Sequence, residues 1–226
     1  MANNQISEFK SRIKAACGAN GFSVIDRNGS LLATLRLIQS DDLQDGDLIK
    51  MLTVLRNRHR TCFLTEFEAT VERTKAWLAT VVVDDPTRAL FRIDLPEGRL
   101  VGHVGAIHRG EALEYDNFIL DDDIGIKNFA VQLAQQFLVW IAKTSGLIAI
   151  FGNVRSSNDH GRDFHIRTGF SEAESIPLKR IVLDNGDVAF RELNIDGDPD
   201  LYIIRIVATV ADLVEAAAGD ARKQQS

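Results

Sequence analysis

The chain has 226 residues, 45% hydrophobic and 26% charged, which is enough for one domain with a large core. A formal net charge of −6 argues against a nucleic-acid partner, and no lysine- and arginine-rich run marks a docking surface for nucleic acid. No apolar run approaches the ~18 residues of a membrane span, the start has no signal-peptide core, and two cysteines make no disulfide framework. We therefore expect a cytoplasmic protein with neither a nucleic-acid nor a membrane partner.

Residues 1–32 form an N-terminal extension. Phe9 and Ile13 lie at helical spacing, and Gly18 follows where the helix is expected to end. Asn28-Gly29 stands between two apolar runs, which predicts a hairpin turn. Two interpretations are open for this extension: a packed N-terminal cap, or a contact in a homodimer.

The next segment combines a strand at residues 34–38 with a helix that Ser40 or Asp41 is expected to cap. This helix ends in a basic run at residues 56–60. The run has two interpretations. Its cations can answer the helix dipole at the C-terminus, or its arginines can bind the phosphates of a substrate.

Strand and helix patterns alternate over residues 33–207, with Thr70 as the cap of a second helix. This alternation predicts a mixed α/β domain with a central sheet of about six or seven strands. Residues 208–226 are expected to form a helical tail with a frayed end. The acidic run at residues 196–200 lacks the glycine position and the last ligand of a calcium loop, so we expect no metal site.

The centre of the chain combines a strand at residues 113–120, an acidic turn, a long helix and a buried strand at residues 147–151. From Phe129 onward the apolar residues recur on one helical face, and Gly146 stops the helix. Such a strand–turn–helix–strand unit implies a parallel crossover. The turn that leads into the helix is where such folds bind phosphates.

Residues 158–170 follow the spacing N-x-x-A-x-x-x-Y-x-x-x-G-F, with Gly161 at the alanine and His165 at the tyrosine. With this motif, residues 113–170 resemble the acetyl-CoA-binding core of the GCN5-related N-acetyltransferases (GNATs). More narrowly, they are similar to the bacterial branch that acetylates amino groups on nucleotide-linked sugars. The resemblance implies a single domain with a mostly antiparallel sheet flanked by helices. One parallel pair, residues 113–120 with 147–151, is expected to splay at one end.

The resemblance also implies that the turn before the long helix grips the pyrophosphate of acetyl-CoA through its backbone N–H groups. The family motif Q/R-x-x-G-x-G/A is partly present there, with Gly125 as the middle glycine. The aspartates at residues 121–123 repel a pyrophosphate, whereas Lys127 and the helix N-terminus attract it. The residues predicted to bind the donor are Ile124, Gly125, Ile126, Lys127, Asn128 and Asn158.

His165 occupies the place of the tyrosine that, in the family, protonates the leaving thiolate. An imidazolium with a pKa of ~6.5 can protonate a thiolate whose thiol has a pKa of ~8.5. The alternative is that His165 only fills the space of the tyrosine ring.

Three residues compete for the role of general base. Glu114 and Asp116, at i and i+2, are expected on one face of their strand, with Tyr115 and Asn117 on the other. Asp116 is favoured, then Glu114, then His103 on the neighbouring strand. A solvated strand edge would hold the two carboxylates equally well.

The residues predicted to bind the acceptor are Arg56, Asn57, Arg58 and Asn117. Together with the resemblance, they imply an acetyl-CoA-dependent N-acetyltransferase whose acceptor is the amine of a nucleotide-linked amino sugar in surface-polysaccharide biosynthesis. Two alternatives are open: a non-catalytic acyl-CoA-binding module, or a transferase acting on an amino acid or a peptide N-terminus.

Overall fold

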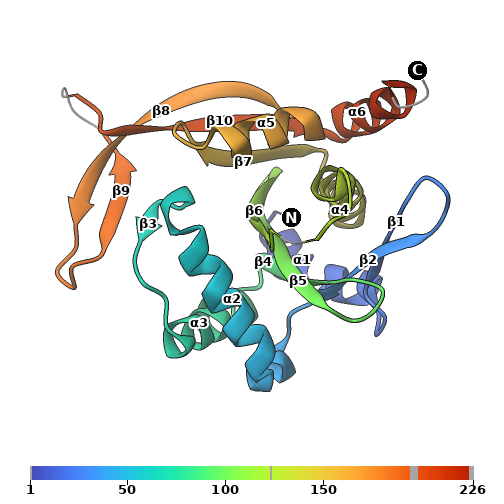
Figure 1. The fold of residues 1–226 in the computed structure, drawn as a ribbon, viewed down its shortest axis with the longest axis horizontal. Helices are drawn as coiled ribbons and strands as arrows, with labels where there is room; N and C mark the ends of the chain where they lie inside the picture. Colours follow the sequence, from blue (N-terminus) through green and yellow to red (C-terminus); the bar gives the residue numbers. More distant parts are fainter. Residues whose placement is uncertain (1, 123, 194–197, 224–226) are drawn as a thin grey trace.

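A computed structural model describes residues 2–122, 124–193 and 198–223 (Figure 1). Its helices are α1 (Ala2–Cys17), α2 (Gly46–Arg58), α3 (Val71–Trp77), α4 (Phe129–Ser145), α5 (Asp159–Thr168) and α6 (Val210–Lys223), with 3-10 turns η1 (Ser40–Gln44) and η2 (Arg60–Cys62) and a π-helical turn η3 (Leu78–Val83). Its strands are β1 (Phe22–Ile25), β2 (Leu31–Leu37), β3 (Thr65–Glu66), β4 (Arg88–Asp94), β5 (Leu100–Arg109), β6 (Ala112–Leu120), β7 (Ala149–Arg155), β8 (Ser171–Val182), β9 (Val188–Glu192) and β10 (Leu201–Thr209). None of the described helices combines the length and apolar character needed to cross a membrane. Part of the acidic run at residues 196–200 lies outside the described residues.

One sheet holds ten strands in the order β1-β2-β4-β5-β6-β7-β10-β8-β9-β3, so the expected count of about six or seven is wrong. Two features enlarge the sheet. The N-terminal hairpin pairs through β2 with β4, and the two-residue strand β3 pairs with β9 at the other end. Within the described residues, every pairing is antiparallel except that of β6 with β7, which is parallel as expected.

The N-terminal helix α1 packs on the main core. Phe9 and Ile13 are buried in the same apolar cluster as the central strands. Lys10 donates hydrogen bonds to the carbonyl oxygens of Val82 and, at 2.7 Å, Val83, at the end of the π-helical turn. The extension is therefore part of the packed structure, whereas its boundary at residue 32 stays a prediction.

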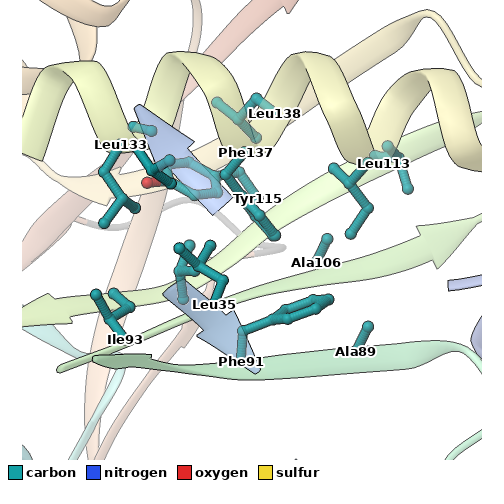
Figure 2. Close-up of a cluster of buried hydrophobic side chains, with 14 of the residues drawn as sticks. Leu35, Ala89, Phe91, Ile93, Ala106, Leu113, Tyr115, Leu133, Phe137 and Leu138 are labelled. Atoms are coloured by element: carbon teal, nitrogen blue, oxygen red, sulfur yellow. The ribbon is translucent and has the colours of Figure 1, made fainter. Parts of the chain in front are cut away.

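Helix α4 covers one face of the sheet with its predicted apolar side (Figure 2). Leu133 and Phe137 are fully buried and lie over Tyr115 of β6. The ring of Phe137 meets that of Phe91, from β4, edge to face at 5.3 Å between centroids. Gly146 ends the helix in the left-handed conformation, with φ 78°, as predicted.

Helix α2 begins later than expected. Asp45 is its N-cap in place of Ser40 or Asp41, because residues 40–44 first form the turn η1. One oxygen of Asp45 accepts hydrogen bonds from the backbone N–H groups of Asp47, at 3.1 Å, and Leu48, at 3.0 Å. A capping carboxylate at this position also suits the helix dipole.

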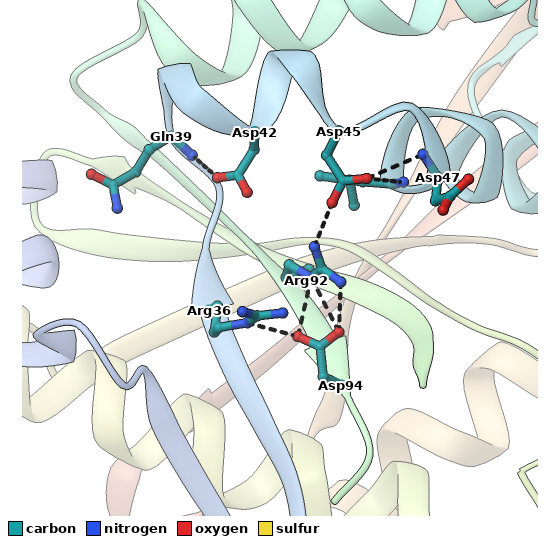
Figure 3. A network of polar contacts seen from close by, with 8 residues as sticks. Arg36, Gln39, Asp42, Asp45, Asp47, Arg92 and Asp94 are labelled. Carbon is teal, nitrogen blue, oxygen red and sulfur yellow. Dashed lines mark hydrogen bonds and ion pairs between the residues drawn. The ribbon is translucent and has the colours of Figure 1, made fainter. Parts of the chain in front are cut away.

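An ion network centred on the buried Asp94 links α2 to the sheet (Figure 3). The other oxygen of Asp45 lies 2.9 Å from Nη1 of Arg92 on β4. Asp94 is almost fully buried and pairs with Arg92 at 2.8 Å and with Arg36 of β2 at 2.9 Å. Because the buried Asp94 is paired and Arg92 also reaches Asp45, the network links the start of α2 to β4.

Candidate active site

A cleft of about 1110 Å³ lies where β6 and β7 part. Its lining includes the turn before α4, the parting strands, α5, and α2 with the loop that follows it. The predicted residues that line it are His103, Glu114, Asp116, His165, Asn117, Arg56, Ile124, Gly125, Ile126, Lys127, Asn128 and Asn158. Asn57 and Arg58 are not among the described residues that line it.

The two parallel strands stay paired over a short length only. Residues Ala112–Glu114 of β6 pair with Ala149–Phe151 of β7, and the ladder then stops although both strands continue. Parallel strands that separate leave backbone N–H and C=O groups without a ladder partner between them. The expected splay is thus present, and it opens the sheet at the middle of the cleft.

A β-bulge shapes β6 just beyond this point. Gly105 pairs with Asp116, whereas His103 pairs with Ile119, so β6 carries one residue more than β5 between these pairs. Asn117, within the bulge, has a left-handed φ of 48°. The expected alternation of side chains is therefore wrong at Asn117. Its Nδ2 donates to Oδ2 of Asp116 at 2.6 Å, so the two side chains meet.

The turn before α4 has two left-handed residues, Gly125 with φ 69° and Asn128 with φ 58°. A Cβ atom added at Gly125 would have no neighbour within 4 Å, so backbone conformation, and not crowding, favours glycine there. The first turn of α4 lines the cleft through Phe129–Val131. Its N–H groups and the positive end of the helix dipole favour an anion at this place.

The aspartates of this turn are paired with α2. Nη1 of Arg58 lies 2.7 Å from Asp121 and 3.3 Å from Asp122, and its hydrogen bond to Asp121 lowers the pKa of that carboxyl group. Arg58 was expected beside the acceptor; its guanidinium faces the turn before α4. Asp123 lies outside the described residues.

Helix α5 places a second cation beside the same turn. Nη2 of Arg167 donates to Oδ1 of Asn128 at 2.8 Å, and Arg167 lines the cleft. Sequence reasoning missed Arg167, because a contact between residues 39 positions apart leaves no local signal.

Asn158 lines the cleft and is the N-cap of α5. Its Oδ1 accepts a hydrogen bond from the N–H of Gly161 at 2.9 Å. A Cβ atom at Gly161 would lie 2.5 Å from Nδ2 of Asn158. Glycine at the alanine position of the motif therefore leaves room for the capping side chain as it is placed.

His165 is enclosed by aromatic rings. Its ring centroid lies 5.0 Å from that of Phe164, 5.5 Å from Phe170 and 5.7 Å from Tyr115. Nδ1 of His165 is buried and has no hydrogen-bond partner among the described residues. Burial lowers the pKa of His165 to about 4, so the neutral ring predominates at neutral pH.

The two carboxylates predicted as bases differ in their partners. Asp116 accepts hydrogen bonds from Nη1 of Arg88 and from Asn117, yet burial raises its pKa. Glu114 pairs with Arg109 at 2.7 Å at the outer end of β6. Asp116 is therefore the better proton acceptor of the two, because its charged form is already disfavoured.

His103, the third candidate base, is buried on β5 beside the bulge. Burial lowers its pKa to about 4, and the nearby His59 acts in the same direction, whereas a hydrogen bond with the backbone of Asn117 opposes both. A histidine with so low a pKa is a weak base at neutral pH.

The far end of the cleft is lined by arginines that lie on phenylalanine rings. The guanidinium of Arg56 stands 3.7 Å from the ring centroid of Phe63 and 4.6 Å from that of Phe67. The guanidinium of Arg73 stands 4.0 Å from the ring centroid of the same Phe67. Burial lowers the pKa of Arg56 to about 10, and its Nη1 is buried without a partner among the described residues. A cation in this state is well placed to bind an anion.

Asn57, predicted to touch the acceptor, instead fixes the loop that carries these rings. Its amide donates to the carbonyl of Ala69 at 3.0 Å and accepts from the N–H of Ala69 at 2.7 Å. Arg155 of β7 pairs with Glu66 in the same loop and donates to the carbonyl of Phe63 at 3.1 Å. The loop is thus held from both sides of the cleft.

Three solved structures show how this architecture compares with known proteins. Spermidine N-acetyltransferase from Vibrio cholerae, in complex with CoA and spermine, matches with a TM-score of 0.60 and 16% identity, over 81% of this chain and 98% of that chain. Apo FdhC, a nucleotide-linked sugar GNAT, matches with a TM-score of 0.56 and 18% identity, over 89% of this chain and 98% of that chain. An N-acetyltransferase from Staphylococcus aureus Mu50 matches with a TM-score of 0.55 and 18% identity, over 79% of this chain and 98% of that chain. No protein-family model and no curated protein matches the sequence.

The chain has the GNAT fold. Within the described residues, no group of three or more His, Cys, Asp or Glu side chains is placed to hold a metal ion. Of the features that shape the cleft of this GNAT fold, sequence reasoning missed the bulge at Asn117 and the cation of Arg167. An asparagine inside a strand pattern was the available signal for the bulge, because asparagine tolerates a left-handed φ better than most residues.

Proposed function

We propose that this chain is an N-acetyltransferase that moves the acetyl group of acetyl-CoA to a primary amine. The observation that carries the proposal is that one cleft joins the turn before α4, the gap between β6 and β7, and the loop after α2. A transferase of this kind must bring two substrates to one point from two directions. The likeness to a structure that contains CoA supports the same assignment.

The turn before α4 fits the pyrophosphate of the donor. The left-handed Gly125, the start of α4 and the side chains of Lys127 and Arg167 all line this end of the cleft. Backbone N–H groups and cations are the usual partners of a phosphate. The pairing of Arg58 with two aspartates of the turn reduces the repulsion that the sequence predicts.

Asp116 is the proposed base that takes the proton of the amine. Its carboxylate lines the cleft beside the bulge, and Arg88 and Asn117 fix its position. The raised pKa of Asp116 makes the carboxylate a stronger base than an exposed one. Glu114 and His103 remain the second and third choices. The assignment of His165 as the acid also stays a prediction, and the lowered pKa of that ring weighs against it.

The acceptor is proposed to be an amino sugar linked to a nucleotide. Arg56 keeps a buried nitrogen without a partner in the described part of the chain, and Arg73 adds a second cation over the same ring of Phe67. A diphosphate would complete the hydrogen bonds of these guanidinium groups. A polyamine such as spermidine would instead meet like charges at this end of the cleft.

Titration calorimetry with acetyl-CoA and a thiol-release assay test both levels of the proposal. The acceptor panel contains a nucleotide-linked amino sugar, the free amino sugar, spermidine and an amino acid. We expect the highest kcat/KM for the nucleotide-linked sugar. Absence of both acetyl-CoA binding and thiol release over the panel would refute the transferase, whereas faster turnover of spermidine would refute only the acceptor.

The variant Arg56→Met tests the arginine end directly. It should raise the KM of the nucleotide-linked sugar ~10-fold or more, because a hydrogen bond to a charged group contributes ~1.5–3 kcal/mol. Turnover of the free amino sugar should change little. Arg60→Met is the matched control, since Arg60 is an exposed arginine of the same basic run and is not among the described residues that line the cleft.

A further inference from the structure

The hydroxyl group of Tyr115 has no partner in the described protein. Its oxygen is buried without a hydrogen bond, although the residue lines the cleft. Almost all buried hydroxyl groups are paired, because an unpaired one loses its hydration without compensation. An unpaired hydroxyl beside a cleft therefore points to a partner that arrives with a ligand.

Tyr115 lies on β6 at the point where this strand separates from β7. Glu114 is the last residue of β6 that pairs with β7, so Tyr115 is the first residue beyond the point where the strands part. Its side chain enters the core under α4, with its oxygen on the side of Leu133 (Figure 2). Asp116, the proposed base, follows directly and meets Arg88 and Asn117 instead. Acid and base candidates thus flank the parting point from the two faces of one strand.

Tyr115 also lies in the aromatic cluster that encloses His165. The two rings meet edge to face, with centroids 5.7 Å apart, and Phe170 stacks on Tyr115 at 6.0 Å. The ring centroid of Phe118 lies 5.9 Å from that of Tyr115. A phenol therefore stands beside the ring that occupies the tyrosine position of the motif.

We infer that the Tyr115 hydroxyl is the proton donor to the leaving thiolate of the donor thioester. The inference rests on the proposed acetyltransferase function. In this step the amine nitrogen bonds to the thioester carbon, the carbon–sulfur bond breaks, and sulfur takes the proton of Tyr115. The phenolate then takes a proton from water, and the proton of the amine passes through Asp116 to solvent. The products are an amide and a free thiol.

The protonation states of the two rings agree with this assignment. Burial raises the pKa of the Tyr115 phenol, so it keeps its proton throughout the physiological range. Burial lowers the pKa of His165 to about 4, so few of its rings carry a second proton at neutral pH. Of the two neighbours, Tyr115 is the one with a proton to give.

The test compares Tyr115→Phe with Tyr202→Phe, which alters the exposed tyrosine of β10. Wild type and both variants are assayed for turnover against pH, for acetyl-CoA affinity by calorimetry, and for thermal unfolding. We expect Tyr115→Phe to lose ~10²–10⁴-fold in kcat, with acetyl-CoA affinity little changed. Its melting temperature should be equal or higher, because the hydroxyl has no protein partner to lose. Tyr202→Phe should match wild type.

Each contrary outcome has its own meaning. Wild-type kcat in Tyr115→Phe overturns the inference. So does a weaker acetyl-CoA affinity with unchanged kcat, since the hydroxyl would then hold the donor without protonating it. A lower melting temperature with normal turnover would reveal a structural hydrogen bond and likewise overturn it. If wild type itself neither binds acetyl-CoA nor releases thiol, the proposed function fails, and the role of Tyr115 fails with it.

Discussion

The two ends of the cleft use their charges in opposite ways. At the donor end, Asp121 and Asp122 stand beside the turn proposed to bind phosphates, yet both are paired with Arg58. At the acceptor end, Arg56 lies on two phenylalanine rings and keeps one nitrogen without a partner among the described residues. At the first end these acidic charges are paired within the protein, whereas the second end presents a cation that a substrate can pair.

This difference shows that the role of a charged residue can be inferred only when its partners in the fold are known. In the sequence, the basic run at residues 56–60 and the acidic turn at residues 121–123 are separate features with opposite implications for phosphate. In the fold, Arg58 of the first meets Asp121 of the second, across 63 positions of the chain. The two features partly cancel each other, and Arg56 is left as the arginine of the run that lines the cleft.

The largest expected effect is a loss of stability at low pH. It comes from two buried histidines in the middle of the cleft, where an unpaired charge is unfavourable. Burial lowers the pKa of both His103 and His165 to about 4, from an ordinary value of 6.5. The unfolded chain therefore binds these protons more tightly than the folded one. The stabilisation is fully present above about pH 6.5 and is lost progressively as the pH falls from 6.5 to 4, by on the order of 3 kcal/mol for each ring.

Urea unfolding at pH 7 and at pH 4.5 measures this loss in the free energy of unfolding. The double variant His103→Gln/His165→Gln is the control, because glutamine does not titrate. Its stability should change less between the two pH values than that of wild type. An equal change in both proteins would assign acid unfolding to carboxylates elsewhere in the chain.

The next largest effect concerns acetyl-CoA binding at the turn before α4. Gly125 has φ 69°, and valine in that conformation is strained by ~1–2 kcal/mol, so Gly125→Val should move the turn and weaken acetyl-CoA binding ~10-fold or more. Gly29→Val is the matched control, with φ 83° in the hairpin turn between β1 and β2. It carries a similar strain and should lower stability while acetyl-CoA binding, measured by calorimetry, stays normal. Unchanged binding in Gly125→Val would exclude this turn from the donor site.

Features set by neighbouring residues were predictable from the sequence. The apolar spacing of α4, its stop at Gly146 and the cap at Thr70, which accepts from the N–H of Arg73 at 3.2 Å, all follow from local rules. The parallel pairing of β6 with β7 followed from the crossover between them. Each of these depends on a short stretch of chain.

Features set by distant residues were not predictable. The bulge at Asn117 depends on the register between β5 and β6. The count of ten strands depends on the pairing of β2 with β4 and of β3 with β9. His165 lines the cleft, but the rings that bury it and lower its pKa come from β6 and from Phe170 just after α5. A residue's position was therefore easier to predict than its protonation state.

The smallest expected effect tests the contrast between the two ends most directly. Arg58→Met keeps an unbranched side chain but removes the cation, so Asp121 and Asp122 would repel the donor phosphates. Because the pair is exposed, acetyl-CoA binding should weaken only ~3–10-fold at low salt, and less at high salt, where screening is stronger. Adding Asp121→Asn should restore much of the affinity, since it removes the charge that Arg58 balances. Calorimetry of both variants at two salt concentrations is the measurement. If Arg58→Met instead leaves acetyl-CoA affinity intact and raises the KM of the acceptor, Arg58 serves the acceptor, as the basic run in the sequence predicts, and the two ends do not differ in the way described.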